Sequence, residues 1–196
     1  MHPLSLPGGF CPPKKAEPPL VKIVEPVTTE EVLETFQLTD PPHEDLSARE
    51  AESYAEKMML LAVEQYGEPW HRVRLSRKEV LSVVLPWHRG ERGELELVPP
   101  TGATVQETLT KLSDWGDEYP TANPLCWEKL HRNSTADISP LILSAGALDH
   151  PHYAEMRERD SLTHLDGLHR MLAWGLWGRL PRFRRLDAYV VGLNLY

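Results

Sequence analysis

The C-terminal part of the chain holds a cluster of residues whose types could carry chemistry. His164 and Asp166 occupy alternate positions of a short apolar run, Gly167 follows, and His169-Arg170 open a segment with helical periodicity. The first backbone amides of a helix have no intrahelical partner and carry partial positive charge. An Arg and a His at such a start predict a binding site for phosphate, sulfate or carboxylate.

The predicted roles follow from the chemistry of each residue type. Gly167 would let the backbone turn sharply and approach the anion closely. Asp166 would act as a general base or orient the substrate, and His164 and His169 would be catalytic histidines. The alternatives are that Asp166 only caps the helix and that His164 is an ordinary strand histidine. The residues predicted to bind the anion or nucleotide are Gly167, Leu168, His169, Arg170, Ser144 and Arg179.

Two of these residues lie outside the turn. Ser144 ends the buried strand that is predicted before it, where loops often carry function, although a serine that only shapes the turn is the alternative. Arg179 belongs to an arginine group with Arg182, Arg184 and Arg185. This group could bind a second phosphate or an acidic carrier surface, and a solvated basic loop explains it equally well.

Histidines and cysteines do not form a recognisable metal motif. Asp149-His150-Pro151-His152 could suggest a metal site together with His164 and His169, yet no His-x-x-x-His pattern or carboxylate pair accompanies them. The two cysteines, Cys11 and Cys126, have no metal-binding spacing and form no disulfide framework. The sequence therefore predicts no metal ligands.

Length, composition and charge limit the class of protein to which this chain can belong. The chain has 196 residues with 41% hydrophobic content, which suits one domain with a substantial core. Its net charge of −8 argues against nucleic acid as the main partner, and no apolar run is long enough to span a membrane. Because the first residues show no secretion signal, we expect a cytoplasmic protein.

The order of patterns predicts an α+β domain with a small mixed sheet and flanking helices. Residues 1–27 read as a Pro-rich arm and 28–196 as one domain, in which 28–68 form an acidic helical layer and 69–196 the core. Predicted strands cover 70–75, 94–98, 139–146 and 187–193, with a short strand before Asp166. Predicted helices begin at Thr28, Ser47 and Thr104 and cover 168–177, and a loop runs through Pro120 and Pro124.

The stretch Asp166-Gly167-Leu168-His169-Arg170, followed by Ala173, resembles the ParB/sulfiredoxin-like superfamily over 140–191. The resemblance implies a phosphate or nucleotide site at this turn, binding ATP or ADP with Mg²⁺ in kinase-type members. The reactive cysteine of sulfiredoxins is replaced by Leu168, so the resemblance does not extend to sulfinic-acid reduction. Partition-type members carry a further DNA-binding module that this chain does not match.

Three functions are consistent with these residues. The first is a small-molecule enzyme that transfers a phosphoryl group from a nucleotide bound at Gly167–Arg170. The second is an elimination or cyclisation in which a phosphate or sulfate ester leaves, as in specialised biosynthesis. The third is a nucleotide-sensing or partner-binding module without enzymatic activity. In each case the acidic helical layer could serve as an interface with a protein partner or a second copy.

Overall fold

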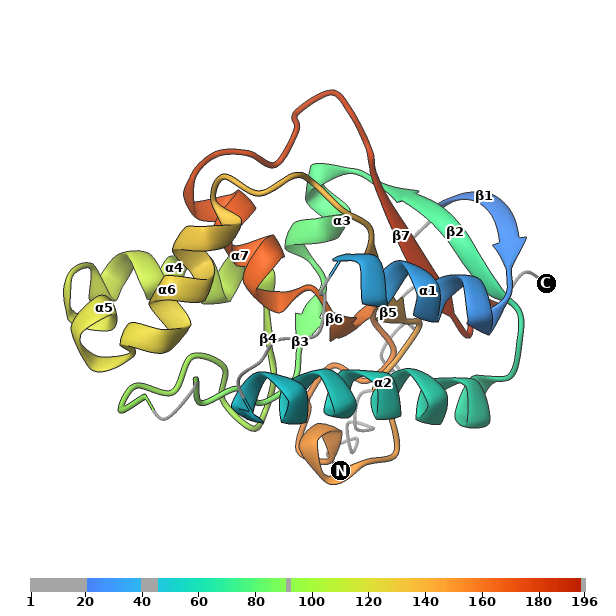
Figure 1. Ribbon diagram of the computed structural model, residues 1–196, viewed down its shortest axis with the longest axis horizontal. Helices are drawn as coiled ribbons and strands as arrows, with labels where there is room; N and C mark the ends of the chain where they lie inside the picture. Colours follow the sequence, from blue (N-terminus) through green and yellow to red (C-terminus); the bar gives the residue numbers. More distant parts are fainter. Residues whose placement is uncertain (1–20, 40–45, 91–92, 195–196) are drawn as a thin grey trace, which may run out of the picture.

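The chain folds around one mixed sheet with helices on both faces (Figure 1). A computed structural model describes residues 21–39, 46–90 and 93–194. For residues 46–52 it describes only the backbone. The sheet has seven strands in the order β1-β2-β7-β5-β6-β3-β4. The strands are β1 Lys22–Val27, β2 Trp70–Leu75, β3 Val84–Leu85, β4 Ala103–Thr104, β5 Leu141–Ser144, β6 Thr163–Asp166 and β7 Leu186–Val191. The predicted α+β class with a mixed sheet is confirmed, although the sheet is larger than expected.

The directions of the strands determine which loops lie close together. Strands β3 and β6 are parallel neighbours, with Val84 opposite Thr163. Strand β5 is antiparallel to β6 and parallel to β7, and the remaining neighbours, β1–β2, β2–β7 and β3–β4, are antiparallel. The carboxyl ends of β3 and β6 therefore lie at one edge of the sheet, the place where ligands commonly bind in folds with parallel strands. The loop after β3 and the turn after β6 both begin there.

Helices cover each face through a separate hydrophobic core. Helices α1 (Thr29–Thr39) and α2 (Leu46–Tyr66) pack on one face, where Phe36 and Met59 join a cluster with Ile142 and Leu165 of the sheet. The other face is covered by α3 Arg77–Leu81, α4 Val105–Trp115, α5 Glu118–Ala122, α6 Pro124–Asn133 and α7 Leu168–Leu176. Helices α4 to α7 gather on the left in Figure 1. A short 3₁₀ turn, η1 Pro151–Tyr153, precedes β6.

Local sequence signals explain most of these elements. The capping box at Ser76 closes with Glu79 at the start of α3, and that at Thr104 closes with Glu107 at the start of α4. The predicted strands at 70–75, 139–146 and 187–193 are confirmed as β2, β5 and β7, and the predicted helix at 168–177 is confirmed as α7. None of the described helices is long and apolar enough to cross a membrane.

Three predictions of local structure are wrong. Residues 94–98 form no strand, and a single bridge joins Val98 to His88. The loop predicted through Pro120 and Pro124 contains α5 and α6, because both prolines lie in a first helical turn, where no amide donor is needed. Residues 22–27 of the predicted arm form the edge strand β1, where Pro26 is tolerated. The rest of the arm, 1–20, lies outside the described residues.

Candidate functional site

The turn between β6 and α7 has the predicted shape. Gly167 is the residue before α7 and has φ of +106°, a conformation that residues with a side chain rarely adopt. A Cβ atom there would lie 2.6 Å from Cδ2 of Leu141. Both the backbone conformation and the packing therefore require glycine, and neither requirement involves a ligand.

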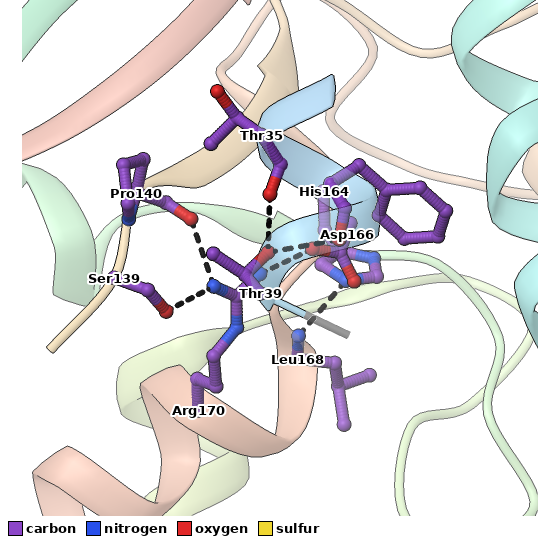
Figure 2. A network of polar contacts seen from close by, with 9 residues as sticks. Thr35, Thr39, Ser139, Pro140, His164, Asp166, Leu168 and Arg170 are labelled. Carbon is purple, nitrogen blue, oxygen red and sulfur yellow. Dashed lines mark hydrogen bonds and ion pairs between the residues drawn. The ribbon is translucent and has the colours of Figure 1, made fainter. Parts of the chain in front are cut away.

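His164 caps helix α7 from within the protein. Its Nε2 accepts a hydrogen bond from the amide of Leu168 at 2.9 Å (Figure 2), so one amide expected to face an anion is already satisfied. Because Nε2 is the acceptor, the neutral ring carries its proton on Nδ1, which is buried and has no hydrogen-bond partner. Burial, followed by the charges of His88, His169 and Arg170, lowers the pKa of His164 to about 3. A histidine that accepts an amide hydrogen bond and stays neutral is poorly suited to the predicted catalytic role.

Arg170 is held by the protein itself. Its Nη1 donates to Ser139 Oγ at 2.5 Å and to the carbonyl oxygen of Pro140 at 2.9 Å, and its Nη2 forms an ion pair with Asp166 (Figure 2). The side chains of Arg170 and Asp166 are only 11% and 15% exposed. In this structure the guanidinium joins the start of α7 to the segment before β5, and it does not point toward an external anion.

The two outlying residues are also engaged in local structure. The Ser144 hydroxyl is buried and donates to the carbonyl oxygen of Gly146 at 2.7 Å, so this serine shapes the turn after β5. Arg179 Nη1 donates to the carbonyl oxygens of Ser134 at 2.8 Å and Ala136 at 2.6 Å, beyond the end of α6. The structure therefore does not bring the predicted anion-binding residues together around one space.

His169 lies in a different cluster, with two residues that the sequence interpretation did not include. Its Nε2 is 3.3 Å from Sγ of Cys126, and Nε2 of His88 is 4.0 Å from the same sulfur. The two imidazole rings meet edge to face, with centroids 5.3 Å apart. The three ligand atoms all lie within 4.8 Å of one another. We refer to His88, Cys126 and His169 as the His-Cys-His cluster.

Three separate segments build the His-Cys-His cluster. His88 follows β3 and His169 follows β6, so the shared edge of these parallel strands brings the two histidines together. Cys126 comes from α6, whose buried face also carries Leu130. Cys126 is fully buried, whereas both histidines are partly exposed. The thiol of the cluster is therefore closed off from solvent, while parts of both histidine residues are exposed.

The two sulfur–nitrogen distances of the cluster are close to those around a tetrahedral metal ion. Ordinary Zn–S and Zn–N bond lengths place the sulfur and nitrogen ligands of one zinc ion about 3.6 Å apart. The distances from Cys126 Sγ to the two imidazole nitrogens, 3.3 and 4.0 Å, lie on either side of this value. The Tyr119 hydroxyl donates to the sulfur at 3.1 Å. Metal ligands are commonly held by outer hydrogen bonds of this kind.

Sequence spacing alone could not indicate this cluster. Its members are separated by 38 and 43 positions, whereas recognisable metal motifs place at least two ligands within a few residues. One usable signal was the helix around Cys126, where Cys126 and Leu130 share one buried face. The loop predicted through Pro120 and Pro124 leaves no helix around Cys126, so this signal is missed.

The other histidines considered for a metal lie elsewhere. Nδ1 of His152 and the Tyr54 hydroxyl share a hydrogen bond of 2.7 Å, and the His152 ring contacts Trp87. His150 packs against Tyr54 and His152. Burial, helped by His150, lowers the pKa of His152. These residues form an aromatic cluster on the side of the sheet that α2 covers.

One family model matches most of the chain. The model of a family of unknown function, DUF6309, matches residues 21–196. The chain belongs to this family. No curated protein and no solved structure matches the chain. The resemblance to the ParB/sulfiredoxin-like superfamily therefore stays a prediction.

Proposed function

We propose that this protein is a metal-dependent enzyme acting on a small molecule, with a divalent transition metal such as Zn²⁺ bound by the His-Cys-His cluster. The observation that carries the proposal is the approach of three ligand atoms, from three distant segments, to within 4.8 Å. One thiolate and two imidazoles are ligands that zinc prefers, and three protein ligands are typical of catalytic sites.

The exposure of the ligands supports a catalytic rather than a structural metal. Structural zinc sites are closed by four protein ligands, whereas catalytic sites keep a position for water or substrate. His88 and His169 are partly exposed, which is compatible with a fourth position that solvent can reach. A metal held by these residues would lower the pKa of bound water and polarise substrate oxygens, which suits hydrolysis or elimination.

A second candidate is thiol chemistry by Cys126 with His169 as its base. The 3.3 Å distance from Sγ to Nε2 favours this reading, because nucleophile–base pairs need hydrogen-bond contact. A reactive thiol must also be accessible to its substrate, and Cys126 is fully buried. Metal binding needs no such access from the thiol side, so it explains the cluster better.

The nucleotide-dependent phosphoryl transfer expected from the sequence has weaker support. ATP or ADP with Mg²⁺ at Gly167–Arg170 would need free donors at the start of α7. The Leu168 amide and both terminal nitrogens of Arg170 already have partners in the protein. Nucleotide binding there would first have to break these contacts.

Cobalt substitution tests the proposal. Co²⁺ bound through a thiolate gives a charge-transfer band in the near ultraviolet, and four-coordinate Co²⁺ gives strong visible bands. We expect both bands, and we expect the visible bands to change on adding azide if a position is open. Absence of the thiolate band in the wild-type protein would reject metal binding, and bands insensitive to azide would reject the catalytic role. Alkylation of Cys126 by iodoacetamide in metal-free native protein, with no cobalt band, would favour thiol chemistry.

A further inference from the structure

A groove of about 600 Å³ lies between the start of α3, the start of α4 and the loop before β7. Three cationic side chains line it, Arg77 and Lys78 from α3 and Arg182 from the loop. The rest of the lining consists of the apolar side chain of Leu81 and of neutral polar side chains, namely Ser76, Ser82, Thr104 and Gln106. No residue of the His-Cys-His cluster takes part, so this groove is a separate feature of the molecule.

The positive charge of the groove is not neutralised by the carboxylates around it. Glu79 accepts from the Ser76 amide at 2.6 Å and pairs with Arg185 at 3.3 Å, and Glu107 accepts from the Thr104 amide at 2.7 Å. In the described part of the chain, no carboxylate pairs with the three cationic side chains of the groove. Arg77 donates instead to the Leu180 carbonyl oxygen at 3.2 Å, which fixes its position without removing its charge.

We propose that this groove binds a small molecule that carries a phosphate or sulfate group. Like charges that line a concave surface reinforce one another and concentrate an oppositely charged ligand, even on a chain whose net charge is −8. The forked guanidinium groups of Arg77 and Arg182 match the oxygen pairs of a phosphoryl or sulfuryl group, and Lys78 adds a third charge.

The size and the neutral groups of the groove indicate more than an isolated inorganic ion. Small-molecule sites range from roughly 300 to 1,000 Å³, and about 600 Å³ falls within that range. The Ser76 hydroxyl oxygen accepts from the Glu79 amide at 3.3 Å, so its hydrogen is available to a ligand. Gln106 is exposed and offers a side-chain amide. These groups can contact the part of the ligand beyond its charged end.

The groove lies in a different part of the molecule from the anion site predicted from the sequence. Arg170 and Arg179 are held by internal contacts, whereas Arg182, a member of the same arginine group as Arg179, lines the groove. The proposal goes beyond the metal-dependent function and does not depend on it.

Calorimetric titration of metal-free protein with pyrophosphate and with sulfate, at 150 mM NaCl, tests the proposal. Single variants Lys78→Gln and Arg182→Gln each remove one charge from the groove. Arg184→Gln is the matched control, because Arg184 is an exposed arginine of the same loop that does not line the groove. We expect each groove variant to weaken pyrophosphate binding at least tenfold, and the control to change it less than twofold.

Two results would overturn the proposal. The first is equal weakening by Arg184→Gln, which would mean that pyrophosphate responds only to the general charge of the loop. The second is no measurable binding of either anion by the wild-type protein. Since the protein is metal-free in this experiment, either failure leaves the metal-dependent function untouched.

Discussion

The side-chain amide of Asn123 forms hydrogen bonds with both the amide and the carbonyl group of Leu95. Its Oδ1 accepts from the Leu95 amide at 3.0 Å, and its Nδ2 donates to the Leu95 carbonyl oxygen at 2.8 Å. Nδ2 also approaches the carbonyl oxygen of Arg89 at 3.3 Å. A Cβ atom at Gly93 would lie 2.1 Å from Nδ2, so the loop passes directly over this buried amide. Asn123 thereby fastens the loop that carries His88 to the start of α6.

The substitution Asn123→Ala should affect both stability and metal binding. It removes the side-chain partners of the Leu95 amide and carbonyl, and a loss of up to about 1–3 kcal/mol is expected for each group because Leu95 is only partly buried. Because His88 and Cys126 then lose their common anchor, we also expect zinc affinity to fall by about tenfold or more, as when outer-sphere partners are removed. Urea unfolding of metal-free protein and zinc competition against a chelator measure the two effects.

Asn133→Ala supplies the control for that experiment. Asn133 ends the same helix, and its Nδ2 donates to the Lys129 carbonyl oxygen at 2.8 Å, far along the chain from the His88 loop. This variant should bind zinc like the wild type. If Asn123→Ala also bound zinc like the wild type, the fastening role of Asn123 would be wrong.

The ion pair between Arg170 and Asp166 should act as a structural pair. Arg170→Ala removes the partner of a largely buried carboxylate, and breaking such a pair typically costs about 3–5 kcal/mol. The double variant Asp166→Leu/Arg170→Met should recover part of the loss, because it removes both charges. Chemical denaturation of the wild type, the single variants Asp166→Leu and Arg170→Met and the double variant gives the coupling energy. A loss below about 1 kcal/mol for Arg170→Ala would instead favour a role for Arg170 outside the fold.

His164 should make the fold sensitive to acid. The pKa of His164 is about 3 in the folded protein, whereas an unfolded histidine titrates near pH 6.5. As pH falls below about 6.5, the unfolded chain takes up a proton that the folded protein excludes, so the free energy of unfolding decreases until about pH 3. His164→Gln keeps an acceptor for the Leu168 amide and removes this titration.

Urea unfolding of metal-free protein at pH 7.5 and pH 5.0 measures this difference. The wild-type protein should lose more stability between the two pH values than His164→Gln does. Equal losses in the two proteins would mean that His164 is protonated in the folded state and does not accept the Leu168 amide hydrogen.

The sequence predicts the elements of the fold where periodicity and capping agree. Strand β2, helix α4 with its capping box at Thr104, and the strand–turn–helix around Gly167 all follow from local patterns. The segment 94–98 alternates like a strand, but the backbone of Leu95 pairs with the Asn123 side chain. A partner so distant in the sequence overrides the local pattern, and no local rule could reveal it.

The candidate site was less accessible to sequence reasoning than the fold. The segment around His169 was identified, but its chemistry depends on residues that approach only when β3 and β6 pair and α6 packs beside α7. Arg170 and Asp166 have the residue types of an anion site, and in the structure their side chains pair with each other. The type of a residue indicates which chemistry its side chain could perform, and its contacts in the folded protein determine which role it takes.

Metal analysis of purified protein tests whether the His-Cys-His cluster binds a metal ion. Protein dialysed against Zn²⁺ and then against buffer without metal would be measured by inductively coupled plasma mass spectrometry, alongside Cys126→Ser, His169→Gln and the control His150→Gln. We expect about one zinc per chain in the wild type and the control. We expect far less zinc in the two cluster variants, with circular dichroism confirming that each protein is folded. Zinc that stays at the wild-type level in folded Cys126→Ser and His169→Gln, or that is absent from the wild type, would mean that the His-Cys-His cluster does not bind the metal.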